Sequence, residues 1–290
     1  MPSKIPFWRT FGDAFGFVFT DFPRFLRLSA GWIALSTIAF ILAIVILGVA
    51  SVQPERPIGG PMHIDWDRTA AQIVLGLIKY LSDVAFAVAW HRIVLLGEAR
   101  GVFGLRFRWR ELRFLLYSWL VAAIIIAILM AAFLLAFAIG FAALSGGGGG
   151  VFGTPWIAAI VFPVSFIVLI ACLPLIGRLS LGLPAIAIEE PQGVLRRAWH
   201  RGWRNGWRLV RGPILCSIPL AIASGLFSAM QGAMSLLVAL DGGWRIGGLI
   251  GETIFWGMSV GVHFLAVATG VTFLSLSYRH LSGSAAPGTG

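Results

Sequence analysis

Six long apolar runs divide the chain, and shorter stretches with polar and charged residues separate them. A helix needs about 20 mostly apolar residues to cross about 30 Å of hydrocarbon. The runs lack the alternating apolar and polar positions of a membrane β-barrel. The pattern therefore predicts an all-α, polytopic membrane helix bundle with six transmembrane helices. The predicted spans are Leu28–Ala50, Ala71–Leu95, Phe114–Leu144, Trp156–Ile176, Pro213–Leu240 and Gly248–Leu276.

The two ends of the chain differ from the spans. In residues 1–27, aromatic side chains such as Phe11 and Phe15 recur at helical spacing, with charged residues between them. This predicts an amphipathic helix that lies in the membrane interface. We expect residues 28–281 to form the six-helix transmembrane domain and the small polar residues 282–290 to form a disordered tail.

Composition supports a membrane protein rather than a soluble one. Of the 290 residues, 58% are hydrophobic and 12% are charged, whereas soluble domains carry about 25% charged residues. The net charge of +10 comes from 22 Lys and Arg against 12 Asp and Glu. In a membrane protein such an excess indicates cytoplasmic loops. Since no stretch is long and polar enough for a soluble nucleic-acid-binding module, we expect no nucleic-acid partner.

The basic residues gather on one side of the predicted bundle. On the other side, the loops carry only Arg56, Arg68 and Arg245. Because cytoplasmic loops are enriched in Lys and Arg, this asymmetry predicts that both the N- and the C-terminus are cytoplasmic. The even number of spans agrees with that orientation.

An arginine pair spaced three residues apart precedes each odd-numbered span. The pairs are Arg24 and Arg27, Arg110 and Arg113, and Arg208 and Arg211. One interpretation is a threefold repeat of helical hairpins, each entered through a basic segment. The alternative is that cytoplasmic charge recurs in any alternating topology. The sequence leaves both open.

A basic and aromatic segment leads into the fifth span. Treated as one helix that begins at Pro191, it places Arg197, Arg201, Arg204, Arg208 and Arg211 on one face. Trp199, Trp203 and Trp207 form a row that starts on the opposite face. This predicts an interfacial helix whose guanidinium groups reach lipid phosphates. All these side chains, with the two earlier arginine pairs, are candidates for binding anionic headgroups; simple anchoring is the alternative.

Two glycines interrupt the same segment. Gly202 and Gly206 weaken a helix by about 1 kcal/mol each relative to alanine. They predict close packing or a bend.

Four ionisable residues fall inside the predicted spans. Lys79 and Asp83 are one helical turn apart in the second span, where they can form an ion pair. Glu252 and His263 lie in the last span. If the second and last spans pack together, the four could form one polar track for protons or a headgroup. The alternative is a satisfied Lys–Asp pair that fixes helix packing.

Catalytic motifs are missing from the sequence. It has no HExxH motif, no phosphate-binding P-loop and no GxSxG elbow. His91 and His200 stand in two copies of the tetrapeptide AWHR, but nothing in the sequence sets a nucleophile beside either. We therefore expect a protein that is not an enzyme, and no cofactor or bound metal.

The stretch from Leu183 to Leu215 resembles a bacterial membrane superfamily. In that pattern a proline ends a span, acidic residues follow, and a basic helix leads into the next span; here these are Pro184, Glu189 with Glu190, and the helix around Trp199. The superfamily includes six-helix inner-membrane proteins and the membrane domain attached to some glycerophosphoryl diester phosphodiesterases. The resemblance implies a bacterial inner-membrane location and a link to envelope physiology. No stretch resembles the soluble phosphodiesterase domain, so the resemblance implies no hydrolase residues.

Three functions are therefore compatible with the sequence. The first is a non-enzymatic inner-membrane protein that binds anionic membrane lipids or acts as a scaffold. The second is a small proton-coupled transporter or channel that uses the intramembrane polar residues. The third is a lipid-modifying membrane enzyme. A cavity that reaches Lys79 and Asp83 favours transport, whereas a sealed pair favours a scaffold.

Overall fold

Helices make up all the regular structure in the described part of the chain. The computed structural model describes residues 4–47, 66–98, 108–145, 154–190, 193–240 and 246–283. The helices are α1 (Phe7–Thr20), α2 (Phe22–Leu47), α3 (Trp66–Leu96), α4 (Trp109–Ser145), α5 (Thr154–Ser180), α6 (Gly182–Ala187), α7 (Val194–Arg201), α8 (Gly206–Leu240) and α9 (Ile246–Ser282). The predicted all-α fold is confirmed.

Six of these helices are long and apolar enough to cross a membrane, namely α2, α3, α4, α5, α8 and α9. The shortest of them has 26 residues, which corresponds to about 39 Å at 1.5 Å per residue and exceeds the thickness of the hydrocarbon core. The predicted six-span membrane architecture is therefore confirmed. Pro191 and the tail beyond Gly283 lie outside the described residues.

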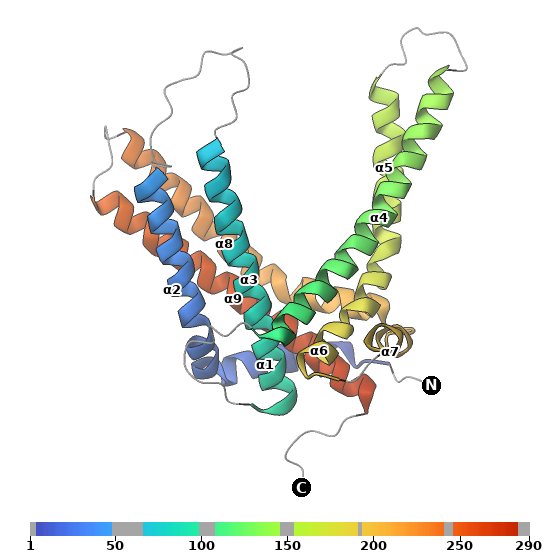
Figure 1. Cartoon of the computed structure of the whole chain (residues 1–290), viewed down its shortest axis with the longest axis horizontal. Coiled ribbons are helices and arrows are strands. Elements are labelled where there is room, and N and C mark those ends of the chain that lie inside the picture. The colour runs from blue at the N-terminus through green and yellow to red at the C-terminus, as the bar shows by residue number, and fades with distance from the viewer. Residues whose placement is uncertain are drawn as a thin grey trace.

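The six spans form two arms that diverge from a common base (Figure 1). In one arm α9 packs against α2, α3 and α8, and in the other α4 packs against α5. The short helices α1, α6 and α7 lie at the base, where α9 also ends. Each predicted hairpin is present, because α2 contacts α3, α4 contacts α5, and α8 contacts α9.

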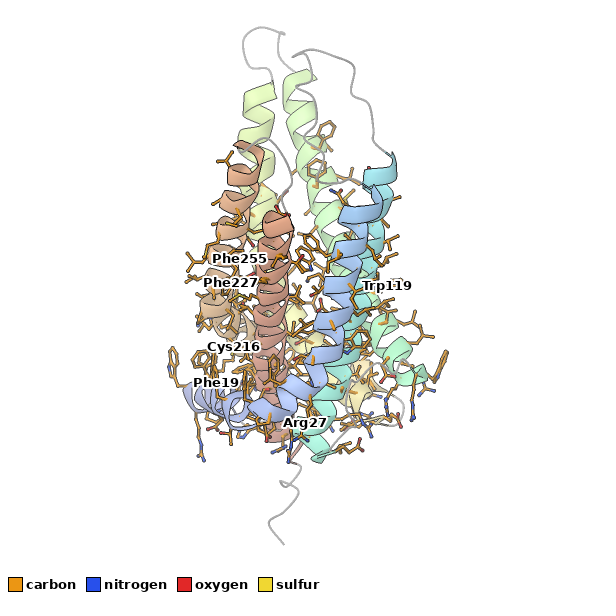
Figure 2. All side chains as sticks on the ribbon, turned by 90° about the vertical axis from the view of Figure 1, so that its left-hand side faces the viewer. Phe19, Arg27, Trp119, Cys216, Phe227 and Phe255 are labelled. Carbon is orange, nitrogen blue, oxygen red and sulfur yellow. The ribbon has the colours of Figure 1, made fainter. Side chains whose placement is uncertain are left out.

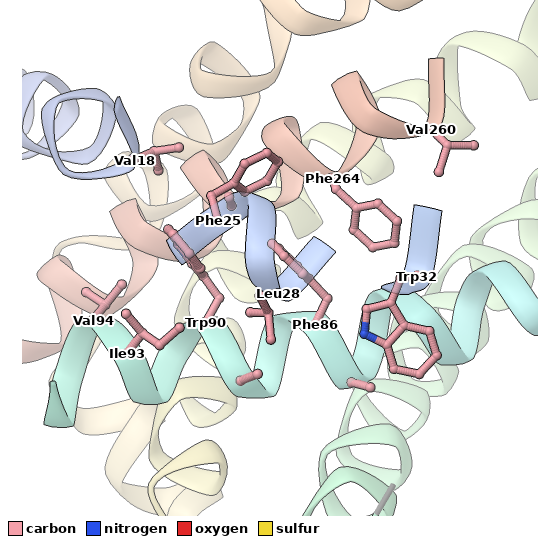
Figure 3. Close-up of a cluster of buried hydrophobic side chains, with 13 residues drawn as sticks. Val18, Phe25, Leu28, Trp32, Phe86, Trp90, Ile93, Val94, Val260 and Phe264 are labelled. Atoms are coloured by element: carbon pink, nitrogen blue, oxygen red, sulfur yellow. The ribbon is translucent and has the colours of Figure 1, made fainter. Parts of the chain in front are cut away.

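An aromatic core holds α2, α3 and α9 together (Figure 3). Trp90 is fully buried, stacks on Phe86 at 5.9 Å between ring centroids, and meets the edge of the Phe25 ring at 6.1 Å. Such pairs contribute about 0.5–1.5 kcal/mol each beyond burial of their area. Because the Trp90 ring nitrogen also donates a hydrogen bond of 2.8 Å to the hydroxyl of Thr272, its polar group is satisfied. This core makes α2, α3 and α9 of the first arm a single packed unit.

Close backbone contacts join the second arm to the first. A Cβ atom on Gly177 would clash with the carbonyl oxygen of Gly206, and one on Gly206 would lie 2.9 Å from the Cβ of Pro174. Within the second arm, the hydroxyl of Tyr117 on α4 donates a hydrogen bond of 2.8 Å to the carbonyl of Leu179 on α5. We call the contact of Gly177 and Pro174 on α5 with Gly206 on α8 the glycine joint.

The continuous helix predicted to run from Pro191 through Arg211 is wrong. Helix α7 ends at Arg201, and α8 begins at Gly206 after a turn in which Arg204 has a φ of 70°. Two interactions favour the break. Gly202 packs against Arg178 too closely for a side chain, and the fully buried Asn205 accepts a hydrogen bond of 3.2 Å from the backbone of Ile5. The bend and the close packing predicted for the glycines are both found.

Helix α1 covers the base with one face and leaves the other exposed. Ala14 is buried in a cluster with Cys216 and Phe273, and Phe7 and Phe11 pack on that cluster. Trp8 is 73% exposed and Phe19 is 57% exposed. The helix ends at Thr20, so the segment predicted as residues 1–27 comprises α1 and the start of α2.

Candidate functional site

A cluster of three polar side chains lies where α3 meets α9. The Nε2 atom of His263 is 2.9 Å from Oδ1 and 3.1 Å from Oδ2 of Asp83. The same nitrogen is 3.0 Å from Nζ of Lys79. Lys79 and Asp83, at i and i+4 on α3, also form an ion pair at 3.6 Å. We call Lys79, Asp83 and His263 the polar cluster.

The fourth predicted residue stands apart from this cluster. Glu252 is buried, but it precedes His263 by eleven residues on the same helix, which corresponds to about 16 Å along the axis. Near the cluster, the hydroxyls of Ser224 and Ser259 lie 3.3 Å apart and link α8 to α9. The track predicted from four residues is thus a compact group of three, and Glu252 lies nearer the N-terminal end of α9.

One ring nitrogen in the cluster faces two competing partners. If Nε2 of His263 carries hydrogen, it donates to Asp83, and the Lys79 ammonium pairs with that carboxylate. If Nε2 carries a lone pair, it accepts from Lys79, and the oxygens of Asp83 face that lone pair without a hydrogen between them. The position of a single proton therefore decides which pair in the cluster is bonded.

The polar cluster forms part of the wall of a large cavity. The cavity has a volume of about 910 Å³ and is lined by α3, α4, α5, α6, α8 and α9. Asp83 and His263 line it, and most of the remaining wall is apolar. Pockets that hold drug-sized ligands measure about 300–1,000 Å³. The cavity is therefore large enough for an organic molecule.

Hydroxyl groups supply most of the other polar atoms in the cavity wall. Tyr80 and Ser118 are 3.1 Å apart between their oxygens and bridge α3 to α4. His91, at the base of the cavity, has Nδ1 2.7 Å from the hydroxyl of Ser275. Among the described lining residues, none is a lysine or an arginine. Asp83 is the only carboxylate among them, and His263 and His91 are the other ionisable side chains of the wall besides Tyr80.

The arginines predicted to bind headgroups fall into two groups. Figure 2 shows nitrogen-bearing side chains gathered at the end of the molecule where Arg27 lies. In the first group, side chains bond within the protein. Glu190 pairs with Arg197 at 3.3 Å and with Arg201 at 3.5 Å. Arg110 bonds Glu111 at 2.9 Å, and Arg208 donates to the carbonyl of Ile5 at 2.8 Å.

The second group of arginines is exposed. Arg27, Arg113, Arg204 and Arg211 belong to it. Arg113 lies 5.6 Å from the ring centre of Trp109, and Arg211 lies 5.8 Å from that of Trp207. Arg24 is also exposed, and it pairs with Asp21 at 3.4 Å. These are the arginines of the predicted set whose side chains face outward.

Two of the predicted tryptophans pack against the same arginine. The guanidinium of Arg178 is 5.1 Å from the ring centre of Trp199 and 4.7 Å from that of Trp203. Sequence reasoning missed this contact, because Arg178 ends the fourth span and the tryptophans lie beyond a turn. The cation–π contacts fix α7 against α5 and leave the outer ring surfaces partly exposed.

No group of three or more His, Cys, Asp and Glu among the described residues could hold a metal ion. Searches of protein-family models, curated proteins and solved structures find no match for this chain. The resemblance to the bacterial six-helix superfamily therefore stays a prediction.

Proposed function

We propose that this integral membrane protein binds a membrane amphiphile inside the helix bundle, with the apolar part in the cavity and the polar part beside Asp83 and His263. The observation that carries the proposal is the cavity of about 910 Å³ with a mostly apolar wall and one polar cluster. Ligand sites in proteins commonly combine an apolar lining with a few placed polar groups. Between helix hairpins in a membrane, lipids and lipid-like molecules are the solutes available to fill such a space.

The role proposed is that of a non-enzymatic lipid-binding protein. This role requires no nucleophile and no cofactor. The exposed arginines at the base, Arg27, Arg113, Arg204 and Arg211, support a second contact with lipid, because basic side chains at a membrane surface attract anionic headgroups. The arginines bonded to Glu190 hold the base together and are not part of this proposal.

The proposed location is the bacterial inner membrane, with the arginine-rich base in the cytoplasm. The support comes from the excess of basic residues at that end and from the expected family resemblance. A C-terminal fusion tests the orientation. Green fluorescent protein should fluoresce there, and alkaline phosphatase should be inactive; the reverse pattern would contradict a cytoplasmic base.

The binding function is tested by filling the cavity. Ala221 on α8 and Ala266 on α9 both line it, so Ala221→Phe with Ala266→Phe places two rings inside. Ala229→Phe on the same α8 is the matched control, since Ala229 is exposed and lies outside the lining. Native mass spectrometry of protein extracted with its lipids should show a lipid retained by the wild type and the control, and lost from the filled variant.

Two results would contradict the binding proposal. If the filled variant unfolds at the same temperature as the control and retains the same lipid, the lipid binds elsewhere and the cavity proposal fails. If no lipid survives in any of the three proteins under mild detergents, binding of a membrane amphiphile is contradicted as well.

A further inference from the structure

Three serine hydroxyls in the cavity wall donate their hydrogens to the helix backbone. Ser118, Ser180 and Ser217 each bond the carbonyl three residues earlier, at 2.8, 2.9 and 2.8 Å respectively. A hydroxyl has one hydrogen and two lone pairs. Because the hydrogen of each of these serines is already used, its oxygen is left to accept a hydrogen bond from a ligand in the cavity.

Two longer side chains of the wall continue this arrangement. The hydroxyl of Tyr80 lies 3.1 Å from that of Ser118, whose hydrogen is used, so Tyr80 is the donor and its oxygen keeps lone pairs. At the base of the cavity, Ser275 donates to the carbonyl four residues earlier at 2.8 Å. Nδ1 of His91 therefore donates to Ser275 at 2.7 Å. In both chains the side-chain hydrogens are passed on toward a backbone carbonyl.

Asp83 adds a carboxylate to these acceptors. It follows Tyr80 by three residues on α3, lines the cavity and has a side chain that is 23% exposed. An ionised carboxylate offers about four lone-pair sites. Since Lys79 and His263 contact it with one nitrogen each, sites remain for a ligand. We call the carboxylate of Asp83 and the hydroxyl oxygens of Tyr80 and Ser118 the acceptor group.

One pair of hydroxyls near the acceptor group can also donate. Ser224, which lines the cavity, lies 3.3 Å from Ser259 between hydroxyl oxygens. Two hydroxyls that share one hydrogen bond hold two hydrogens, so the pair can both donate and accept. A ligand hydroxyl has the same two capacities, and it can therefore match this pair as well as the acceptor group.

We propose that the cavity selects an amphiphile whose headgroup is uncharged and carries hydroxyl groups, which donate to the acceptor group. This inference rests on the proposed function and adds the headgroup class. An ionised phosphate or carboxylate brings only acceptors, so it would set oxygen against oxygen in a wall whose described residues include no lysine or arginine. An ammonium headgroup would bury a charge beside a carboxylate that Lys79 already pairs with. Glycerol and sugar hydroxyls share the required chemistry.

A matched pair of probes isolates the hydroxyl hydrogens. The monohexadecyl ether of glycerol and the same compound with both hydroxyls methylated share one chain and the same oxygens, but only the first can donate. Hexadecyl sulfonate and hexadecylamine supply an anionic and a cationic headgroup. The full chain is placed in nanodiscs of dioleoylphosphatidylcholine, a lipid whose headgroup has no hydrogen to donate. A glycerol ether with a photoreactive diazirine in its chain is then crosslinked to the protein.

Each unlabelled probe competes with the photoreactive one at a known fraction of the membrane, and peptide mass spectrometry locates the crosslinks. The glycerol ether should prevent crosslinks in the cavity at about a tenfold lower fraction than its methylated form, because the methylated form cannot donate to the acceptor group. The sulfonate and the amine should also compete less well than the glycerol ether. The filled variant, Ala221→Phe with Ala266→Phe, should lose these crosslinks.

Two variants assign the preference to its residues. Ser118→Ala removes one acceptor oxygen, and Lys79→Met with Asp83→Leu removes the carboxylate. Each should lower the preference for the glycerol ether over its methylated form. Because this preference is a ratio within one protein, loss of the fold would remove both competitors rather than change their ratio. Ser228→Ala is the control, since Ser228 is exposed on α8 outside the lining, and it should leave the ratio unchanged.

The contrary results separate the two proposals. If the methylated ether competes as well as the glycerol ether, or if either charged probe competes better, the headgroup proposal is refuted while the cavity function stands. If the preference is undiminished in both Ser118→Ala and the Lys79→Met, Asp83→Leu variant, the acceptor group does not read the headgroup and the proposal fails. If crosslinking is the same in the wild type and the filled variant, the proposed function itself fails.

Discussion

Tyr278, near the end of α9, donates a hydrogen bond to Glu190, a residue 88 positions earlier that follows α6. The same carboxylate pairs with Arg197 and Arg201 of α7, and the Arg201 guanidinium lies 5.1 Å from the ring centre of Tyr278. One acidic side chain thereby fastens α7 and the last span to each other at the base of the molecule.

Removal of that carboxylate should destabilise the base. Glu190→Ala leaves two partly buried guanidinium groups and a tyrosine hydroxyl without their acceptor, so we expect a loss of about 1–3 kcal/mol in unfolding free energy. Thermal unfolding in a mild detergent measures it. Glu189→Ala, next in the chain but with a side chain 55% exposed, should cost less. Equal losses would mean that the network contributes nothing specific.

Removing one partner of the ion pair in the second span should lower stability more than replacing both partners by apolar residues. Asp83→Asn removes the counter-charge of Lys79 within an apolar span, which should lower stability by about 1–3 kcal/mol. The double variant Lys79→Met with Asp83→Leu leaves no stranded ammonium and should lose less. The two unfolding temperatures are compared; equal temperatures, or a less stable double variant, would mean that Lys79 is hydrated when Asp83 is neutralised.

Charge reversal of exposed arginines should reduce the anionic lipid held by the protein. Arg204→Glu with Arg211→Glu changes side chains that face outward and leaves the bonds of Glu190 intact. Protein reconstituted from mixed neutral and anionic lipid should then carry less anionic lipid, and the difference should shrink at high salt. Arg56→Glu, predicted on the opposite side, serves as the control. Equal anionic lipid in all three proteins would leave simple anchoring as the role of these arginines.

The glycine joint should not tolerate even a methyl group. In Gly206→Ala the new Cβ would lie 2.6 Å from the backbone oxygen of Pro174, so we expect a loss of about 1–3 kcal/mol. Gly225→Ala on the same helix has open space around the new atom and should be neutral or stabilising by up to about 1 kcal/mol. Thermal unfolding of the two variants tests the joint, and similar values would show that α5 and α8 can separate freely.

The spans could be predicted from sequence because length and apolar content set them directly. Lys79 and Asp83 could be paired in advance because one helical turn separates them, and His263 could be named because charge inside a span needs a partner. Glu252 was grouped with them because it lies in the same predicted span as His263. Eleven residues of helix separate it from His263, and the contacts of His263 with Lys79 and Asp83 show which level of α9 meets the ion pair.

Other features depend on tertiary contacts that no local pattern reports. The break after Arg201 requires Gly202 to meet Arg178 and Asn205 to bond the backbone of Ile5, two partners distant in the chain. Likewise, the pattern of basic residues on a helix does not show that Arg197 and Arg201 form ion pairs with Glu190. The cavity was unpredictable for a related reason, since apolar side chains look alike in sequence whether they face lipid, another helix or an internal space.

The glycine joint also makes α5 a lever. From Gly177 to the start of the helix at Thr154 the rod is about 35 Å long, so a tilt of about 5° at the joint displaces the far end by about 3 Å. The span α4, packed along α5, would move with it. The width of the space between the arms therefore depends at one end on side-chain volumes at positions that carry no charge.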